Sequence, residues 1–348
     1  MKKLLIILVI ILSFAGHPVH SEEKTDITVT AVGDIMMGTD FPKRYKNLPD
    51  GDGKDLFVHV TDILSQGDVV FGNLEQVLSD NGQCAKDINR PNMWAFRSPA
   101  SYAENLKKAN FNVMSIANNH AWDFGKEGSA DTMKALDAVG IRHSGPIGDI
   151  AQLGINGLRI ALIAFSRNLN GYSFLDTRKS NEVITSLSRQ FDIVIVSFHG
   201  GAEGVKAQHT KDADEYFGKE SRGNVVKFSR NAIDNGADLV IGHGPHVPRA
   251  MELYNNKLIA YSLGNFCTYG IISIKGIKGI APILKVELAD NGDFVSGRIY
   301  SFKQEPPGYP VPDQSRKAAN IMKHLTEADF PNTGLIIDED GNISKRPM

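Results

Sequence analysis

Potential metal ligands follow four strand-like apolar runs of this chain. Each run ends directly at imidazoles, a carboxylate or a carboxamide. The four endings are Gly33-Asp34, Asn118-Asn119-His120, His199-Gly200-Gly201 and His243-Gly244-Pro245-His246. Because ligands of α/β sheets gather outside the carboxyl ends of the strands, the four endings together predict one cation-binding crevice.

The mixture of donors favours a borderline divalent ion such as Zn, Mn, Fe or Ni, since Ca and Mg prefer all-oxygen cages. Asn73 and Glu75 add a carboxamide and a carboxylate that point the same way in an extended chain. Donors of this kind suit two ions that share a carboxylate, and such a pair clamps both oxygens of a displacement at phosphorus. Taken singly, Asp34 also fits a turn former, and Asn73 with Glu75 also fits a helix cap.

The overall composition is that of an ordinary globular protein. The chain has 348 residues, of which 42% are hydrophobic and 22% charged, and this excludes a disordered or fibrous protein. The net charge of -2 provides no overall field for nucleic acid, so no nucleic-acid partner is expected.

Residues 1–21 have the order of a secretory signal peptide. Two lysines precede the apolar stretch 4–15, and a small residue, Ser21, stands before a polar run. The stretch is shorter than the about 20 residues that a membrane span needs. We expect cleavage after Ser21 and an extracytoplasmic protein, secreted or periplasmic, with an uncleaved anchoring signal as the alternative. Cys84 and Cys267 are expected to be unrelated, although an oxidising compartment would permit a disulfide.

Strand-like and helical stretches alternate after the signal, which predicts sequential α/β layers with right-handed crossovers. The predicted strands are 27–32, 68–71, 112–116, 158–165, 192–198, 239–241 and 257–263. The predicted helices are 57–65, 98–108 with Ser98 as N-cap, 128–139, 181–189, 224–235 and 314–325. Strands 283–288 and 297–302, joined by a turn at 290–293, predict an antiparallel hairpin and hence mixed sheets. The proline-rich run 305–312 is expected to break regular structure.

The spread of the candidate ligands bears on the domain count. They run from Asp34 to His246, so a boundary between them would split the site. The sequence therefore predicts one domain over residues 22–304, preceded by the signal peptide 1–21. Residues 305–348 are expected to form a C-terminal extension packed on that domain.

The ordered motifs resemble those of a known protein family. They are Gly33-Asp34, Gly72-Asn-Leu-Glu75, Ala117-Asn-Asn-His120 with Asp123 and Gly125, His199-Gly-Gly201, Gly242-His-Gly-Pro-His246 and Tyr261-Ser-Leu-Gly-Asn-Phe266. This order is similar to that of the bacterial poly-γ-glutamate capsule biosynthesis proteins, relatives of the calcineurin-like metallophosphoesterases, and it spans roughly residues 27–268. The resemblance implies a four-layer α/β/β/α sandwich with mixed sheets and a site at the strand carboxyl ends.

Carried over to this chain, the resemblance implies roles for particular residues. The implied metal ligands are Asp34, Glu75, Asn119, His199, His243 and His246. His120 is implied to stabilise or protonate the reacting group, and Asp123 to orient it through a hydrogen bond. Asn118 and Arg97 are the candidate substrate-binding residues. Arg249 is a further candidate for neutralising an anionic substrate.

This chain departs from the phosphoesterase pattern in three places. Met36 stands where those enzymes have the histidine of Asp-x-His, and Asn73 replaces a bridging aspartate. His243 and His246 are separated by two residues rather than one. One metal position is therefore expected to be weakened, altered or empty, and Glu75 becomes the candidate for the shared carboxylate.

Three functions follow from these residues. The favoured one is an extracytoplasmic metal-dependent protein of poly-γ-glutamate-type capsule biosynthesis, export or attachment, with a hydrolase-like site for two divalent ions such as Mn, Fe or Zn. Its expected partners are an anionic envelope polymer or a phosphoester substrate, and a membrane capsule-synthesis complex. The alternatives are a secreted general phosphoesterase and a non-catalytic polymer-binding accessory protein.

Overall fold

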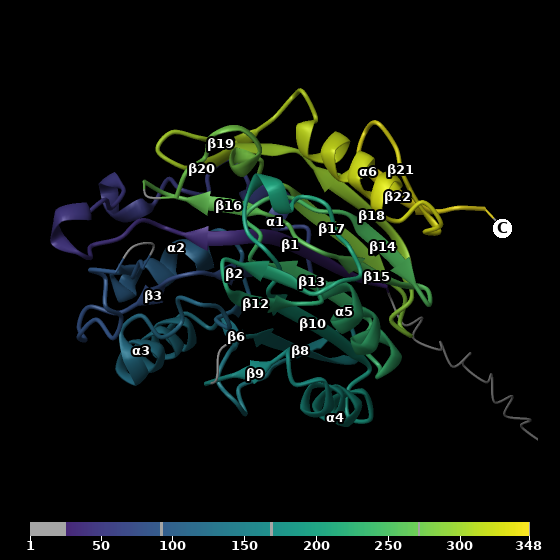
Figure 1. Ribbon diagram of the computed structural model, residues 1–348, viewed down its shortest axis with the longest axis horizontal. Coiled ribbons are helices and arrows are strands. Elements are labelled where there is room, and N and C mark those ends of the chain that lie inside the picture. Colours follow the sequence, from purple (N-terminus) through teal and green to yellow (C-terminus); the bar gives the residue numbers. More distant parts are fainter. Residues whose placement is uncertain (1–25, 91–92, 168–169, 271, 348) are drawn as a thin grey trace, which may run out of the picture.

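The computed structural model describes residues 26–90, 93–167, 170–270 and 272–347 (Figure 1). The predicted signal peptide lies outside these residues. Within the described ranges, no helix has the length and apolar character that crossing a membrane requires.

Two mixed sheets form the body of the molecule. The first sheet has nine strands in the order β21-β22-β18-β17-β1-β2-β5-β6, with β16 also paired to β1. Its strands are β1 (Ile27–Met36), β2 (Val69–Leu74), β5 (Val113–Ser115), β6 (Arg142–Ser144), β16 (Asn265–Thr268), β17 (Ile283–Leu288), β18 (Phe294–Tyr300), β21 (Leu335–Ile337) and β22 (Asn342–Lys345). Strands β1, β2, β5, β6 and β16 are parallel, whereas β17, β18, β22 and β21 add antiparallel pairs.

The second sheet has seven strands in the order β14-β15-β13-β10-β8-β7, with β9 beside β8. They are β7 (Ala151–Ile155), β8 (Leu158–Ser166), β9 (Tyr172–Ser173), β10 (Ile193–His199), β13 (Leu239–His243), β14 (Met251–Tyr254) and β15 (Lys257–Ala260). Its central strands are parallel, and β7 and β14 run antiparallel at the two edges.

Helices, short ribbons and 3-10 turns complete the described chain. The helices are α1 (Thr61–Leu64), α2 (Ala103–Lys108), α3 (Gly125–Ala138), α4 (Thr177–Ser188), α5 (Val225–Asp234) and α6 (Lys317–Asp329). The ribbons pair β3 (Val77–Leu78) with β4 (Arg97–Ser98), β11 (Glu215–Phe217) with β12 (Glu220–Gly223), and β19 (Phe302–Glu305) with β20 (Tyr309–Pro312). The 3-10 turns are Lys43–Tyr45, Asp50–Gly53, Ala100–Tyr102, Val205–Ala207 and Gly276–Gly279.

Three apolar clusters show how the layers stack. The central cluster joins the facing sides of the two sheets, with Val29 and Phe71 from the first and Ile195 and Ile241 from the second. A second cluster lies between the first sheet and α1, α2 and α3, and a third lies between the second sheet and α4 and α5. The predicted α/β/β/α sandwich with mixed sheets is therefore confirmed.

A bulge in β1 turns Asp34 toward the second sheet. Ala31 packs in the central cluster, whereas Val32 and Ile35 pack on the outer side. Side chains of a regular strand alternate, so Val32 and Asp34 would share the outer face. The register with β2 shifts between Ala31 and Asp34, which reverses the alternation. Gly33 permits this bulge because a Cβ there would lie 2.0 Å from the carbonyl oxygen of Gly264.

The C-terminal third confirms one prediction and corrects another. Strands β17 and β18 form the predicted hairpin, with β18 beginning at Phe294. The proline-rich run 305–312 was expected to lack regular structure, and this is wrong, because β20 pairs with β19. A proline lacks an amide donor. In a two-stranded ribbon, however, one edge of each strand is unpaired and needs no donor. The predicted boundary at residue 304 falls within β19, and residues after it supply β21 and β22 to the first sheet (Figure 1).

The helix start predicted at Ser98 is also wrong. The Ser98 hydroxyl donates to the carbonyl oxygen of Gly38 at 2.8 Å, so it does not cap a helix. The segment after it forms the 3-10 turn Ala100–Tyr102 before α2 begins. The predicted helix 57–65 is helical only over α1. Both cysteines lie in the described part of the chain, and they are not bonded to each other.

Arg249 is a structural residue rather than a free anion-binding group. Its side chain is completely buried, and its two terminal nitrogens donate to Glu215 at 2.8 and 2.7 Å. The same guanidinium donates to the carbonyl oxygen of Ala202 at 3.0 Å. It thereby ties the loop that follows His199 to β11. The expectation that Arg249 neutralises a substrate is not met, because its charge is already compensated inside the protein.

Removal of the Arg249 guanidinium should destabilise the fold strongly. Arg249→Met leaves Glu215 as a largely buried carboxylate without its partner, so the free energy of unfolding in urea should fall by about 3–5 kcal/mol. The double variant Arg249→Met, Glu215→Leu should recover more than half of that loss. The exposed helical pair of Arg178 and Glu182 is the control, and Arg178→Met should leave the unfolding midpoint unchanged. Equal effects of the two single variants would contradict the assignment.

Candidate metal centre

Strands of the two sheets direct their carboxyl ends at one buried group of polar side chains, which we call the crevice. The first sheet contributes Asp34 from the end of β1 and Glu75 directly after β2. The second contributes His199 and His243, the last residues of β10 and β13. These two histidines are register partners in the parallel pairing, so their imidazoles project from the same face at the same level. Residues 118–120 follow β5 and approach from the first sheet.

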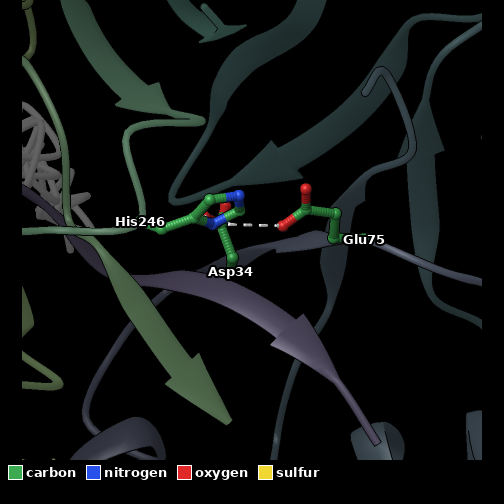
Figure 2. Close-up of side chains that lie close together, drawn as sticks. All are labelled: Asp34, Glu75 and His246. Atoms are coloured by element: carbon green, nitrogen blue, oxygen red, sulfur yellow. Dashed lines mark hydrogen bonds and ion pairs between the residues drawn. The ribbon is translucent and has the colours of Figure 1, made fainter. Parts of the chain in front are cut away.

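Asp34, Glu75 and His246 form the tightest group in the crevice (Figure 2). Nδ1 of His246 lies 3.0 Å from Oδ2 of Asp34 and 3.7 Å from Oε2 of Glu75. One potential ligand atom from each residue lies within 4.8 Å of the others. His246 adopts a left-handed φ of 59°, a strained conformation for a non-glycine residue that is often stored at functional sites. The loop therefore holds a strained backbone conformation that directs this imidazole at the two carboxylates.

The other predicted ligands surround this group. Nδ1 of His243 lies 3.3 Å from Oδ1 of Asp34, and Nε2 of His199 lies 3.7 Å from Oε1 of Glu75. Several buried polar atoms of the crevice have no hydrogen-bond partner within the described chain. They are both carboxylate oxygens of Glu75, both ring nitrogens of His243, Nε2 of His199 and Oδ1 of Asn119.

This set of atoms fits a divalent cation. Buried polar atoms are almost always satisfied, so a cluster of unsatisfied ones indicates a missing partner. Carboxylate oxygens, imidazole nitrogens and a carboxamide oxygen accept a cation but offer each other few donors. The same mixture suits Mn, Fe or Zn.

Buried charges perturb the titration of the crevice. Burial raises the pKa of Glu75 well above its usual value and lowers the pKa of His199 well below its usual value. Burial also acts against charge on Asp34, but its close contacts with the His243 and His246 imidazoles outweigh burial and hold the pKa of Asp34 far below normal. At His246, burial is outweighed by the charges of Glu75 and Asp34, which raise its pKa to about 10. Positive charge is therefore favoured between the two carboxylates.

An amide network links the crevice to the strand ends. Asn118 accepts from the backbone amide of His120 at 2.9 Å and donates to the carbonyl oxygen of Leu74 at 2.9 Å. It also donates to Oδ1 of Asn73 at 3.1 Å. Asn73 in turn donates to Oδ1 of Asp34 at 2.9 Å. Asn118 is fully buried and all of these contacts are internal, so the structure places it as a scaffold for the crevice.

His120 and Asp123 lie together, as their spacing suggested. Nδ1 of His120 lies 2.8 Å from Oδ2 of Asp123, which also accepts from the backbone amide of Phe96 at 2.7 Å. Asp123 is completely buried, whereas His120 keeps 8% of its surface exposed. Burial lowers the pKa of His120 in spite of the neighbouring carboxylate. The neutral imidazole is therefore favoured, and it is held at Nδ1 and mostly buried.

Lys86 and Asn265 were missed by the sequence reasoning. The Lys86 ammonium lies 2.5 Å from Oδ1 of Asp123 and 3.4 Å from Nδ1 of His120. No motif marks this lysine, because it lies in an irregular loop. Oδ1 of Asn265 lies 3.1 Å from Nδ1 of His246, and the residue pairs with Asp34 in the sheet. Its place in the Tyr261–Phe266 motif was the signal that could have found it.

Arg97 lies at the edge of this region and is engaged by protein groups. Its guanidinium pairs with Asp40 at 2.9 Å, donates to the carbonyl oxygen of Asn81 at 2.9 Å and stacks over Phe124. The structure therefore does not present it as a free anion ligand. Its role in substrate binding stays a prediction.

Comparisons with known proteins place the chain in context. The family model described as "Bacterial capsule synthesis protein PGA_cap" matches residues 28–269. The capsule biosynthesis protein CapA of Bacillus anthracis is 30% identical, over 90% of this chain and 76% of that protein. The PGA biosynthesis protein CapA of Bacillus subtilis is also 30% identical, over 69% of this chain and 63% of that protein.

Solved structures with a similar arrangement are more distant. A hypothetical protein from Thermus thermophilus aligns with a TM-score of 0.48 and 17% identity, over 80% of this chain and all of that one. The NAD nucleotidase of Haemophilus influenzae aligns with a TM-score of 0.45 and 9% identity, over 87% of this chain and 56% of that one.

Asn118→Asp tests the amide network. The aspartate keeps the oxygen that faces the amide of His120, but it sets a second oxygen against the oxygens of Leu74 and Asn73. The free energy of unfolding should fall by about 3 kcal/mol at neutral pH. Burial raises the pKa of the new carboxyl, so stability relative to wild type should decline further from about pH 5 to about pH 8. The exposed Asn170 provides the control, and a pH-independent or negligible effect at position 118 would refute the network.

Proposed function

This chain belongs to the family of bacterial capsule synthesis proteins PGA_cap, and on that premise we propose that it is a metal-dependent hydrolase acting on an anionic envelope polymer of the poly-γ-glutamate type. One observation carries the proposal. Asp34, Glu75 and His246 gather potential ligand atoms within 4.8 Å of one another, beside buried donors and acceptors that lack partners. Such a cluster is costly unless it binds something positive.

The residues divide into two groups by their surroundings. Asp34, Glu75 and His246 would hold the cation, with His199, His243 and Asn119 around it. When bound, a divalent cation in such a site supplies a Lewis acid and lowers the pKa of a water molecule toward neutrality. Asp34 and Glu75 are 0 and 1% exposed, so solvent would screen their attraction for a cation only weakly.

We assign the proton transfer to His120. Asp123 accepts at Nδ1 and so fixes that nitrogen as the protonated one, which leaves Nε2 to exchange a proton with a substrate. His120 keeps 8% of its surface exposed, and an incoming chain would approach it there. General acid or base catalysis by a positioned imidazole contributes about 10²–10⁴-fold to a rate.

Location and partners follow from the sequence features and the family. The basic start and apolar stretch within residues 1–21 support export, so the protein would act outside the cytoplasm, cleaved or anchored by that segment. There it would meet the polymer as it leaves a membrane capsule-synthesis complex. Capsule and PGA biosynthesis are the processes for which the two CapA relatives are named.

Metal content is the first test of the proposal. The purified mature chain should retain Mn, Fe or Zn after dialysis, as measured by inductively coupled plasma mass spectrometry. Asp34→Asn and His246→Ala should lose that metal while keeping the circular dichroism spectrum of the wild type. His59→Ala, at an exposed residue outside the crevice, should retain it. Unchanged metal in both crevice variants would show that these residues are not the ligands.

Turnover is the second test. The metal-loaded protein should shorten poly-γ-glutamate, seen by gel filtration, and His120→Ala should lower the rate about 10²–10⁴-fold without loss of metal. An aryl phosphodiester is assayed in parallel. Hydrolysis of the phosphodiester alone would support a secreted phosphoesterase instead. Polymer binding that survives His120→Ala and His243→Ala, without any cleavage, would support an accessory protein.

A further inference from the structure

The orientation of the Asn118 amide is fixed by the backbone. A backbone amide can only donate, and a backbone carbonyl can only accept. The amide of His120 lies 2.9 Å from one end of the Asn118 side chain, and the carbonyl oxygen of Leu74 lies 2.9 Å from the other. The first end must therefore be oxygen and the second must be the NH₂ group.

The orientation of Asn73 follows from that of Asn118. The Asn118 NH₂ group lies 3.1 Å from one end of the Asn73 side chain, so that end must be oxygen. The NH₂ group of Asn73 then faces the crevice, 2.9 Å from Oδ1 of Asp34 and 3.3 Å from Nδ1 of His199. A reversed Asn73 would set its oxygen against the Asp34 carboxylate and its NH₂ group against that of Asn118.

This NH₂ group removes ligands from one side of the crevice. It donates to Oδ1 of Asp34 and lies 3.3 Å from Nδ1 of His199, so its hydrogens, which carry partial positive charge, oppose a cation in the space between these two atoms. A second cation on this side would be left with the neutral donors of Asn119, His199 and His243 and a share of Glu75.

The opposite side of the crevice keeps a complete set. Oδ2 of Asp34, Oε2 of Glu75 and Nδ1 of His246 are untouched by Asn73, and two of these three are carboxylate oxygens. We infer that the crevice holds a single divalent cation on Asp34, Glu75 and His246, and that the NH₂ group of Asn73 prevents a second from binding. This inference rests on the proposed metal dependence and concerns the number of ions and the residue that sets it.

The decisive variant restores an acceptor where the donor now lies. Asn73→Asp keeps the oxygen that accepts from Asn118 and replaces the NH₂ group with a carboxylate oxygen between Asp34 and His199. The extra negative charge is tolerable only with a cation beside it, and it frees Nδ1 of His199 from its donor. We expect a second ion to bind. Asn105→Asp is the matched control, because Asn105 is buried at 7% exposure and lies outside the crevice.

The experiment counts Mn²⁺ ions per chain by equilibrium dialysis with mass spectrometry, using Mn²⁺ alone as the probe. Electron paramagnetic resonance at low temperature separates an isolated Mn²⁺ ion from a spin-coupled pair. Wild type and Asn105→Asp should bind one ion with the isolated spectrum, and Asn73→Asp should bind two with the coupled spectrum. Circular dichroism confirms that each variant is folded.

The outcomes separate the two proposals. No bound Mn²⁺ in the wild type would overturn the proposed metal dependence and the inference with it. Two ions in the wild type would overturn the inference and leave the metal dependence standing. A folded Asn73→Asp variant that still binds one ion would also overturn the inference, because Asn73 would not be the residue that sets the number. If that variant does not fold, the wild-type count alone decides.

Discussion

Asp34 and Glu75 are both withdrawn from water between the two sheets, where an ionised carboxylate costs several kcal/mol unless positive charge or hydrogen-bond donors compensate it. Much of the surrounding structure supplies that compensation or makes room for it. The bulge at Gly33 turns Asp34 inward, and the strained His246 brings an imidazole against both carboxylates. Asn73 donates to Asp34, and nothing within the described chain donates to Glu75. The arrangement is stable as a whole because three apolar clusters hold the strands that carry these residues.

The layered fold was predictable because its strands are continuous apolar runs and its turns carry strong local signals. The hairpin of β17 and β18 is an example, since a turn sequence and two alternating strands agree on it. The predictions that were wrong failed for physical reasons. Ser98 has the composition of a helix cap, but a tertiary contact with Gly38 takes its hydroxyl. The prolines of 305–312 suggested irregular chain. The ribbon of β19 and β20 nevertheless forms, because it needs few of the amide donors that prolines lack.

The crevice was predictable to the level of residue type and approximate place. Ligand types at the ends of parallel strands must converge, and Asp34, Glu75, His199, His243 and His246 do so. What the sequence could not supply was the pairing of individual atoms. Arg97 and Arg249 have the chemistry of anion ligands, but each forms an ion pair with a carboxylate of the protein itself. Lys86 has no motif, and only the path of its loop brings it to Asp123. The direction in which an amide points, as at Asn73, depends on backbone groups that no sequence pattern specifies.

Strand β1 is near the start of the chain and pairs with strands from its last third, so the order of synthesis affects when the crevice can form. The strand that carries Asp34 is made early, and β2 pairs with it soon afterwards, but its pairing with β17 and β16 needs residues that follow more than two hundred positions later. Contacts so distant in sequence form late in folding. The crevice therefore cannot be complete until nearly the whole polypeptide has been synthesised. On the proposed metal dependence, the ion would then be drawn from the compartment in which folding finishes, so the local supply of metals there, rather than affinity alone, would select it.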